Sequence, residues 1–132
     1  PPNLAAALPG AVCATVSGPE GVTAVRMGAP AVESTGVATA GSAAVPGTVY
    51  VDHVIVRPGA GSLVAATASA GSGAAPVSLV TDLGLRYALA GDEVLGMLGY
   101  AGRTPLRLPA EVVALLPAGP ALDPQTARLP AA

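Results

Sequence analysis

Alternating apolar and polar positions predict two short β-strands near the start of the chain. The first covers residues 11–16, AVCATV, and the second covers residues 22–27, VTAVRM, with a turn at SGPEG between them. One side of the first run is apolar and consists of Val12, Ala14 and Val16. Cys13 and Thr15 take the other side, because successive side chains of a strand point to opposite faces. The pattern is typical of a half-buried strand.

Longer β-prone and small-residue segments alternate through the middle of the chain. Residues 48–56, TVYVDHVIV, form the most β-prone run because they are rich in β-branched side chains. We expect residues 62–68, SLVAATA, to return as the partner of that strand. Residues 28–47 lack a sustained period and predict a long surface loop. Residues 69–76, SAGSGAAP, predict a second flexible connection.

The run VSLVTDLGLRYAL at residues 77–89 predicts a β-hairpin. Its three-residue connection ends at Gly84, which suits the left-handed conformation that such a turn requires. This pairing places Leu79 beside Tyr87 on an apolar side, with Arg86 pointing the opposite way. The opposite, mixed side carries Ser78, Val80, Arg86 and Ala88.

The pattern after the hairpin predicts a short helix and a further strand. The helix has Asp92 as its cap, Glu93 in its first turn and Gly99 as its stop. Residues 104–109, TPLRLP, predict a brief strand between two prolines.

Two more helix starts follow, each marked by a proline. The first has Pro109 in its favoured first turn and ends before Pro117. The second has Asp123 as the cap and Pro124 in the first turn. Because strands dominate the early part and helices join them later, the sequence predicts an α+β fold.

Composition narrows the possible functions. A chain of 132 residues has the size of one domain, and its 52% apolar content includes no Phe or Trp. The core must therefore be built from Val, Leu and Ala. The chain has no Lys and a net charge of −2, with its Arg residues scattered, so we expect no nucleic-acid binding, which needs a basic surface. The missing Lys also excludes a P-loop.

The candidate catalytic and metal-binding residues are few. Asp52 precedes His53, the single histidine, but neighbours on a strand face opposite ways, so Asp52 is not placed to orient it as in a catalytic triad. One His and one Cys make a zinc site improbable. Asp92 and Glu93 are better explained as a helix start than as an acid–base pair. We therefore expect no catalytic residue, no cofactor and no metal.

Several motifs in a fixed order resemble a known family. They are DHVIVRPGAGSLV at residues 52–64, LVTDLGLRYAL at 79–89, LGYAG at 98–102, PLRLP at 105–109 and ALLPAGPALDP at 114–124. Each is unspecific alone, but the ordered set, with the neighbourhood of Cys13, resembles the C-terminal part of EccB. EccB is a core membrane component of the type VII (ESX) secretion machinery. The likeness covers most of residues 10–128.

The resemblance implies a division of the chain. Residues 1–9 would be an arm leading into the first strand, and 10–68 the C-terminal part of a central β domain, with 28–47 as its long loop. Residues 69–75 would be a linker. Residues 76–123 would be the last ββαβα repeat, similar to a cell-wall-binding subunit of a phage lysin, followed by a C-terminal tail at 124–132. Because the chain begins with Pro-Pro, we expect it to be processed or part of a longer protein.

The resemblance also implies a function. An EccB-like chain would be a structural component on the extracytoplasmic side of the cell membrane, in a parent protein anchored by a single span. Its partners would be EccC, EccD, EccE and the mycosin protease, and self-association is expected. The alternatives are a cell-wall glycan-binding module and, second, an ATPase, although no motif here supports ATP hydrolysis.

Two residues carry specific expectations under this resemblance. In the family, a cysteine at the place of Cys13 forms a disulfide with one far upstream, so its partner would lie outside this chain. A small buried cysteine without a redox role is the other interpretation. Arg86 is the candidate for contact with a neighbouring repeat or subunit, so we expect its replacement by Ala to alter assembly more than folding.

Overall fold

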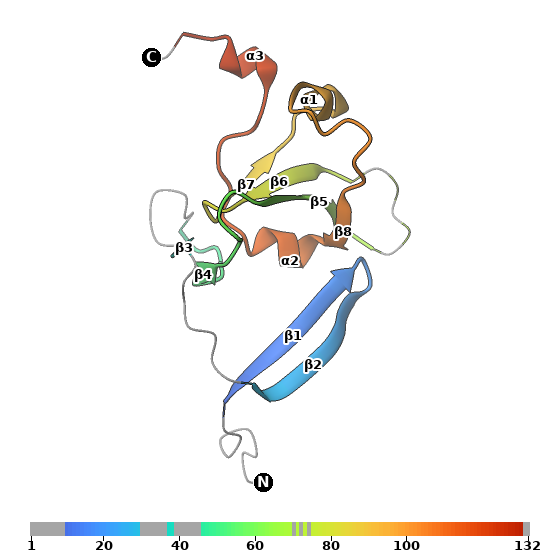
Figure 1. Cartoon of the computed structure of the whole chain (residues 1–132), viewed down its shortest axis with the longest axis vertical. Helices are drawn as coiled ribbons and strands as arrows, with labels where there is room; N and C mark the ends of the chain where they lie inside the picture. Colours follow the sequence, from blue (N-terminus) through green and yellow to red (C-terminus); the bar gives the residue numbers. More distant parts are fainter. Residues whose placement is uncertain are drawn as a thin grey trace.

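The computed structural model describes residues 10–29, 37–38, 46–69, 71, 73 and 75–130. Its strands and helices form a β-hairpin at the N-terminal end of the described chain and a separate layer of sheet and helices (Figure 1). Strands are the larger share of the regular structure, and helices pack beside them, so the α+β class is confirmed. The arm expected at residues 1–9 lies outside the described residues.

A four-stranded sheet forms the centre of the molecule. Its order is β7-β6-β5-β8, formed by Arg86–Ala88, Val77–Thr81, Gly61–Thr67 and Leu106–Pro109. β5 pairs antiparallel with β6, and parallel with β8. The strand predicted at residues 62–68 is therefore present, but the partner predicted for it was wrong. The sheet takes β5 from before the linker expected at residues 69–75 and the other three strands from after it.

The core lies between this sheet and α2 (Ala110–Ala114). Val64 of β5, Val80 of β6 and Val113 of α2 are almost completely buried and contact one another. The residues packed around them are Val56, Ala66, Leu108 and Leu116. Thr67 of β5 is buried as well, and its hydroxyl donates to the Leu108 carbonyl at 3.1 Å, which satisfies its polar group. The core is small and aliphatic, as the composition requires.

The hairpin of β6 and β7 has the predicted turn and register. Leu79 pairs with Tyr87, and Gly84 has a φ of 75° in the three-residue connection. The mixed side, however, is the buried one. Ser78 and Val80 are buried, and Val80 packs with Val113 of α2, whereas Leu79 on the apolar side is only half-buried. Packing against α2 decides which face is covered, and hydrophobicity along the strand does not reveal that partner.

The prediction of a long strand at residues 48–56 was wrong. Only His53–Val54 (β4) are in a strand, and they pair with Val37–Ala38 (β3) inside the expected loop of residues 28–47. Most of that loop lies outside the described residues. The Val51 amide instead donates to the Leu115 carbonyl at 3.0 Å, so this segment crosses to the end of α2. A β-prone run forms a strand only where a hydrogen-bonding neighbour runs beside it.

The predicted helices are present with small shifts. α1 (Asp92–Met97) has Gly91 rather than Asp92 as its cap residue, and no side chain caps it. Gly99 has a φ of 79° just after this helix, as its predicted role as a stop requires. Pro109 is likewise the cap residue of α2, one position before its predicted place. Shifts of one residue are common, because the exact first residue of a helix is not fixed by its capping signal.

The last helix, α3 (Pro124–Ala127), has the predicted cap. The Gln125 amide donates to Asp123 Oδ1 at 2.9 Å, and the Thr126 hydroxyl donates to Asp123 Oδ2 at 2.7 Å. These bonds, led by the Thr126 hydroxyl, lower the pKa of the Asp123 carboxyl. Among the described helices, none is long and apolar enough to cross a membrane.

Candidate functional site

The N-terminal hairpin presents an apolar face that is open to solvent. It consists of β1 (Ala11–Gly18) and β2 (Gly21–Ala29), which pair antiparallel. Partners in this register lie on the same face, and the cross-strand pairs of one face are Val12 with Met27, Ala14 with Val25, and Val16 with Val22. The Val12, Val22, Val25 and Met27 side chains are 57–66% exposed. The strands were predicted correctly, but this apolar side is not half-buried.

The hairpin extends away from the sheet and helices and approaches them only near its turn (Figure 1). β8 is the described element that β1 contacts there. A two-stranded hairpin has two open edges and little buried area, so alone it is marginally stable in water. Four large exposed side chains on one face of such a hairpin form an apolar patch, the kind of surface that often marks an interaction site.

The opposite face of the hairpin carries Cys13. Cys13 lies across from Arg26 and is half-buried, with a free thiol among the described residues. Nearby, the Thr23 hydroxyl donates to the Thr15 carbonyl at 3.1 Å and lies 3.1 Å from the Ser17 hydroxyl. The expected disulfide with a residue outside this chain stays a prediction. Its location is consistent with a link made from the hairpin face opposite the apolar one.

Arg86 lies at the junction between β7 and the segment that follows α2. Its Nε donates to the Leu116 carbonyl at 3.0 Å. Its backbone amide donates to the Pro117 carbonyl at 3.0 Å, and its carbonyl accepts from the Gly119 amide at 2.9 Å. The residue is half-buried, on the same side of the sheet as α2. These contacts occupy Arg86 within the chain, and its expected role toward another subunit stays a prediction.

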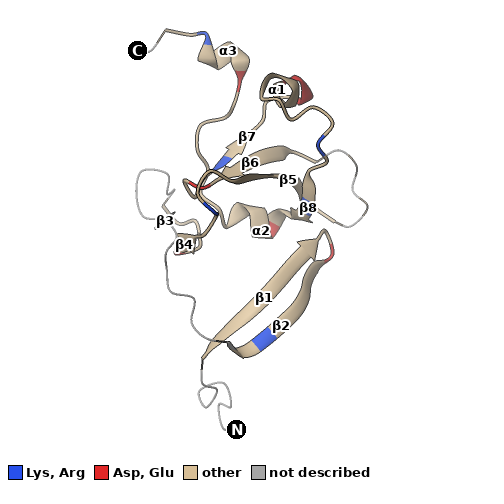
Figure 2. Cartoon of the chain, viewed as in Figure 1, with Lys and Arg blue, Asp and Glu red and all other residues tan. Residues whose placement is uncertain are grey.

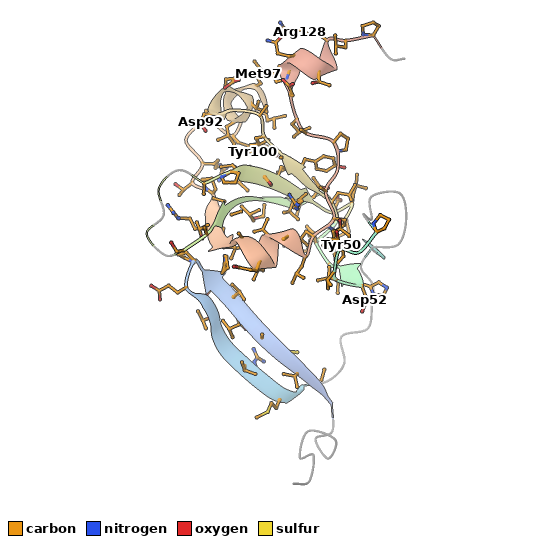
Figure 3. All side chains as sticks on the ribbon, turned by 180° about the vertical axis from the view of Figure 1, so that it is seen from behind. Tyr50, Asp52, Asp92, Met97, Tyr100 and Arg128 are labelled. Carbon is orange, nitrogen blue, oxygen red and sulfur yellow. The ribbon has the colours of Figure 1, made fainter. Side chains whose placement is uncertain are left out.

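Asp52 and His53 lie beside each other without converging on a site. His53 is exposed in β4, and Val54 next to it is buried. Asp52 is exposed as well and points away from the sheet in Figure 3. Within the described part of the chain, no three His, Cys, Asp or Glu residues lie close enough to share a metal ion.

Asp92 and Glu93 both lie in the first turn of α1. Both side chains are exposed, and the Glu93 carboxylate folds back over Gly91, where a Cβ would meet its oxygens. The placement of two carboxylates at the positive end of a helix accounts for their position. The sequence therefore predicted their location at the start of a helix, but the assignment of Asp92 as the cap was wrong, because Gly91 is the cap residue.

The apolar hairpin face was missed as a candidate site, although its alternation was visible. Residues 11–16 and 22–27 carry the signal of a strand with one apolar side, but such a signal does not distinguish a side covered by the core from one left open.

The chain is similar to a known protein family. The model of the family described as "Type VII secretion system ESX-1, transport TM domain B" matches residues 5–131. No curated protein and no solved structure matches the chain. The family match spans the hairpin, the sheet and the C-terminal helices together.

Proposed function

Because the chain belongs to the EccB family of the type VII secretion system, we propose that it is a structural component that assembles with other subunits of that machinery. The observation that supports this proposal is the exposed apolar face of β1 and β2. Contiguous apolar surface of this kind on a soluble fold marks an interaction site. A partner that covers it would remove those side chains from water and close an open strand edge.

The rest of the molecule is consistent with assembly. Charged residues make up 11% of the chain, and those that the structure describes are scattered over the ribbon without a basic or acidic cluster (Figure 2). Such a surface offers no strong electrostatic steering, so binding would depend on shape and apolar contact. We propose EccC, EccD, EccE and the mycosin protease as the partners, on the extracytoplasmic side of the membrane.

We also propose that residues 76–123 form one repeat unit of ββαβα type. The element order β6, β7, α1, β8 and α2 supports this assignment. β5 precedes the unit and completes the sheet between β6 and β8. The repeat would be held firmly to the preceding segment, because β5 of that segment pairs with both β6 and β8 of the repeat.

The assembly role is tested by co-purification in the source bacterium. Val25→Lys places a charge on the apolar face, whereas Ala24→Lys places the same charge on the exposed opposite face one residue away. Burying an unpaired ammonium is costly, so Val25→Lys is expected to lose the secretion subunits while Ala24→Lys retains them. Equal recovery of these subunits with both variants would contradict the proposal.

The two alternatives have separate readouts on the same purified chain. Saturable binding to purified peptidoglycan would favour the cell-wall-binding module. Phosphate release from ATP above that of a denatured control would favour the ATPase. We place assembly first because the exposed hairpin face has no evident use in either alternative.

A further inference from the structure

A groove lies on the face of the sheet that α2 leaves uncovered. Its cavity volume is about 390 Å³, within the range of binding clefts. Leu63 of β5 and Leu79 of β6, which pair across the sheet, form its floor. The loop between α1 and β8 forms its wall, and Tyr100 of that loop lies below α1 in Figure 3. Sequence reasoning did not single out this groove.

The wall combines an aromatic ring with an unneutralised positive charge. The Tyr100 side chain is 38% exposed, and Leu106 at the start of β8 is 45% exposed. Arg103 is exposed on the same wall, and its guanidinium makes no hydrogen bond or ion pair with any described residue. No acidic residue is among the described residues that line the groove. The groove is therefore apolar at its floor and positive at its rim.

Backbone hydrogen bonds hold this wall in place before any partner arrives. The Tyr100 amide donates to the Leu95 carbonyl at 2.7 Å, and the Arg103 amide donates to the Tyr100 carbonyl at 3.0 Å. Gly99 and Gly102 adopt positive φ values of 79° and 77° at the two bends of the loop. A wall ordered in advance loses less conformational entropy on binding.

We propose that this groove docks an extended acidic segment of a partner protein, with an apolar residue next to an Asp or Glu. This proposal rests on the assembly role proposed above. It adds the groove to the hairpin face as a second surface that contacts a partner. The apolar side chain would pack on Leu63 and Leu79 beside the Tyr100 ring. The carboxylate would accept two parallel hydrogen bonds from Arg103. Tyr and Arg are among the residue types enriched at the positions that contribute most binding energy in protein interfaces.

The chemistry of the groove favours a peptide over a saccharide. A sugar carries hydroxyl groups around its ring, and those that face Leu63 and Leu79 would lose their water without gaining a partner. The hydroxyl groups on the lining come from Ser62, Tyr100 and Thr104, and none comes from Leu63 or Leu79, which form the floor. A peptide with alternating apolar and acidic side chains satisfies both the floor and the rim.

Site-specific photo-crosslinking in the native secretion complex tests this docking. A p-benzoylphenylalanine replaces Thr104 on the rim, and a second one replaces Met97, which is exposed on α1 outside the lining, as the positional control. Each is combined with Arg103→Glu or with Arg128→Glu. Arg128 is exposed just after α3 and serves as the matched charge control. Mass spectrometry then identifies the crosslinked segment.

The expected result is a crosslink from position 104, absent from position 97, to an apolar–acidic segment of a partner subunit. Arg103→Glu should reduce its yield roughly tenfold or more, since a charge-assisted bond is lost, and Arg128→Glu should leave it unchanged. A crosslink that survives Arg103→Glu, or a crosslinked segment without an acidic residue, would overturn the proposal. So would attachment to glycan or no crosslink at all.

The two proposals fail in different ways. If the secretion subunits still co-purify in a Val25-dependent manner but position 104 gives no crosslink, the groove proposal is wrong and the assembly role stands. If no subunit co-purifies with the unaltered chain, the assembly role is wrong, and the groove proposal fails with it.

Discussion

Arg86 joins the hairpin of β6 and β7 to the segment after α2 through one side-chain and two backbone hydrogen bonds. The carbonyl of Leu116 lies in a half-buried region, where an unpaired acceptor is costly. The sequence placed Arg86 correctly on the mixed side but left that side open for a partner. Because α2 covers it, the side chain contributes to the fold in addition to any contact with another subunit.

Replacement of Arg86 by Ala is therefore expected to lower the free energy of unfolding by about 1–3 kcal/mol. The loss comes from the unsatisfied Leu116 carbonyl. Urea denaturation of the purified chain measures it, with Arg128→Ala, an exposed arginine, as the control. Equal stability of the two variants would contradict a contribution of the Arg86–Leu116 hydrogen bond to folding.

Asp123 gives the fold a pH dependence at its C-terminal end. Its pKa is lowered by the Thr126 hydroxyl and the Gln125 amide, so the carboxylate stabilises α3 at pH values above the ordinary Asp pKa of about 4. That contribution is lost as the pH falls through the lowered pKa. Amide chemical shifts of Gln125 and Thr126 should report a titration midpoint below the ordinary value. Asp123→Asn should abolish that titration, and a midpoint at or above the ordinary value would contradict the cap.

At the level of elements, the β6–β7 turn and the cap of α3 could be predicted from local sequence, whereas the pairing of distant strands could not. The β6–β7 turn at Gly84 and the cap at Asp123 depend on neighbours within a few residues, and both are present as predicted. β5 was recognised as a strand, but its partners lie in both directions along the chain. No local pattern specifies which of several β-prone runs will lie beside it.

The contacts of the segment after α2 could not be predicted from local sequence either. Residues 117–122 run beside β7, with bridges from Arg86 to Ala118 and from Leu89 to Leu122. Gly119 lies so close to Tyr87 that an added Cβ would be 2.5 Å from the ring. Glycine is required there because of the Tyr87 ring, which lies 32 positions earlier in the sequence. The sequence around Gly119 alone does not reveal this requirement.

Gly119→Ala is therefore expected to destabilise the chain by roughly 1–3 kcal/mol, because hydrogen bonds hold both the segment and β7 in place. Gly96→Ala is the matched control. Gly96 lies inside α1 with open space around it, so alanine there should stabilise by about 0.5–1 kcal/mol. Thermal unfolding of both variants measures the difference, and a neutral Gly119→Ala would contradict the packing of Tyr87.

At the scale of the whole molecule, a small aliphatic core supports one sheet while a hairpin with an exposed apolar face extends from it (Figure 1). A chain without Phe or Trp has limited apolar volume, and the described core is built from valines of β5, β6 and α2. The hairpin contributes little to that core. The chain belongs to the EccB family of the type VII secretion system, and we propose that assembly with another subunit covers this apolar face.

Hydrogen–deuterium exchange of the hairpin, compared between the isolated chain and the purified secretion complex, tests this account most directly. If another subunit covers the apolar face, amides of β1 and β2 should exchange roughly tenfold or more slowly in the complex, because opening then requires the interface to separate. Amides of β6 should change little, since this strand is already paired on both sides. Hairpin exchange that is equally fast in the chain and in the complex would contradict the assembly role.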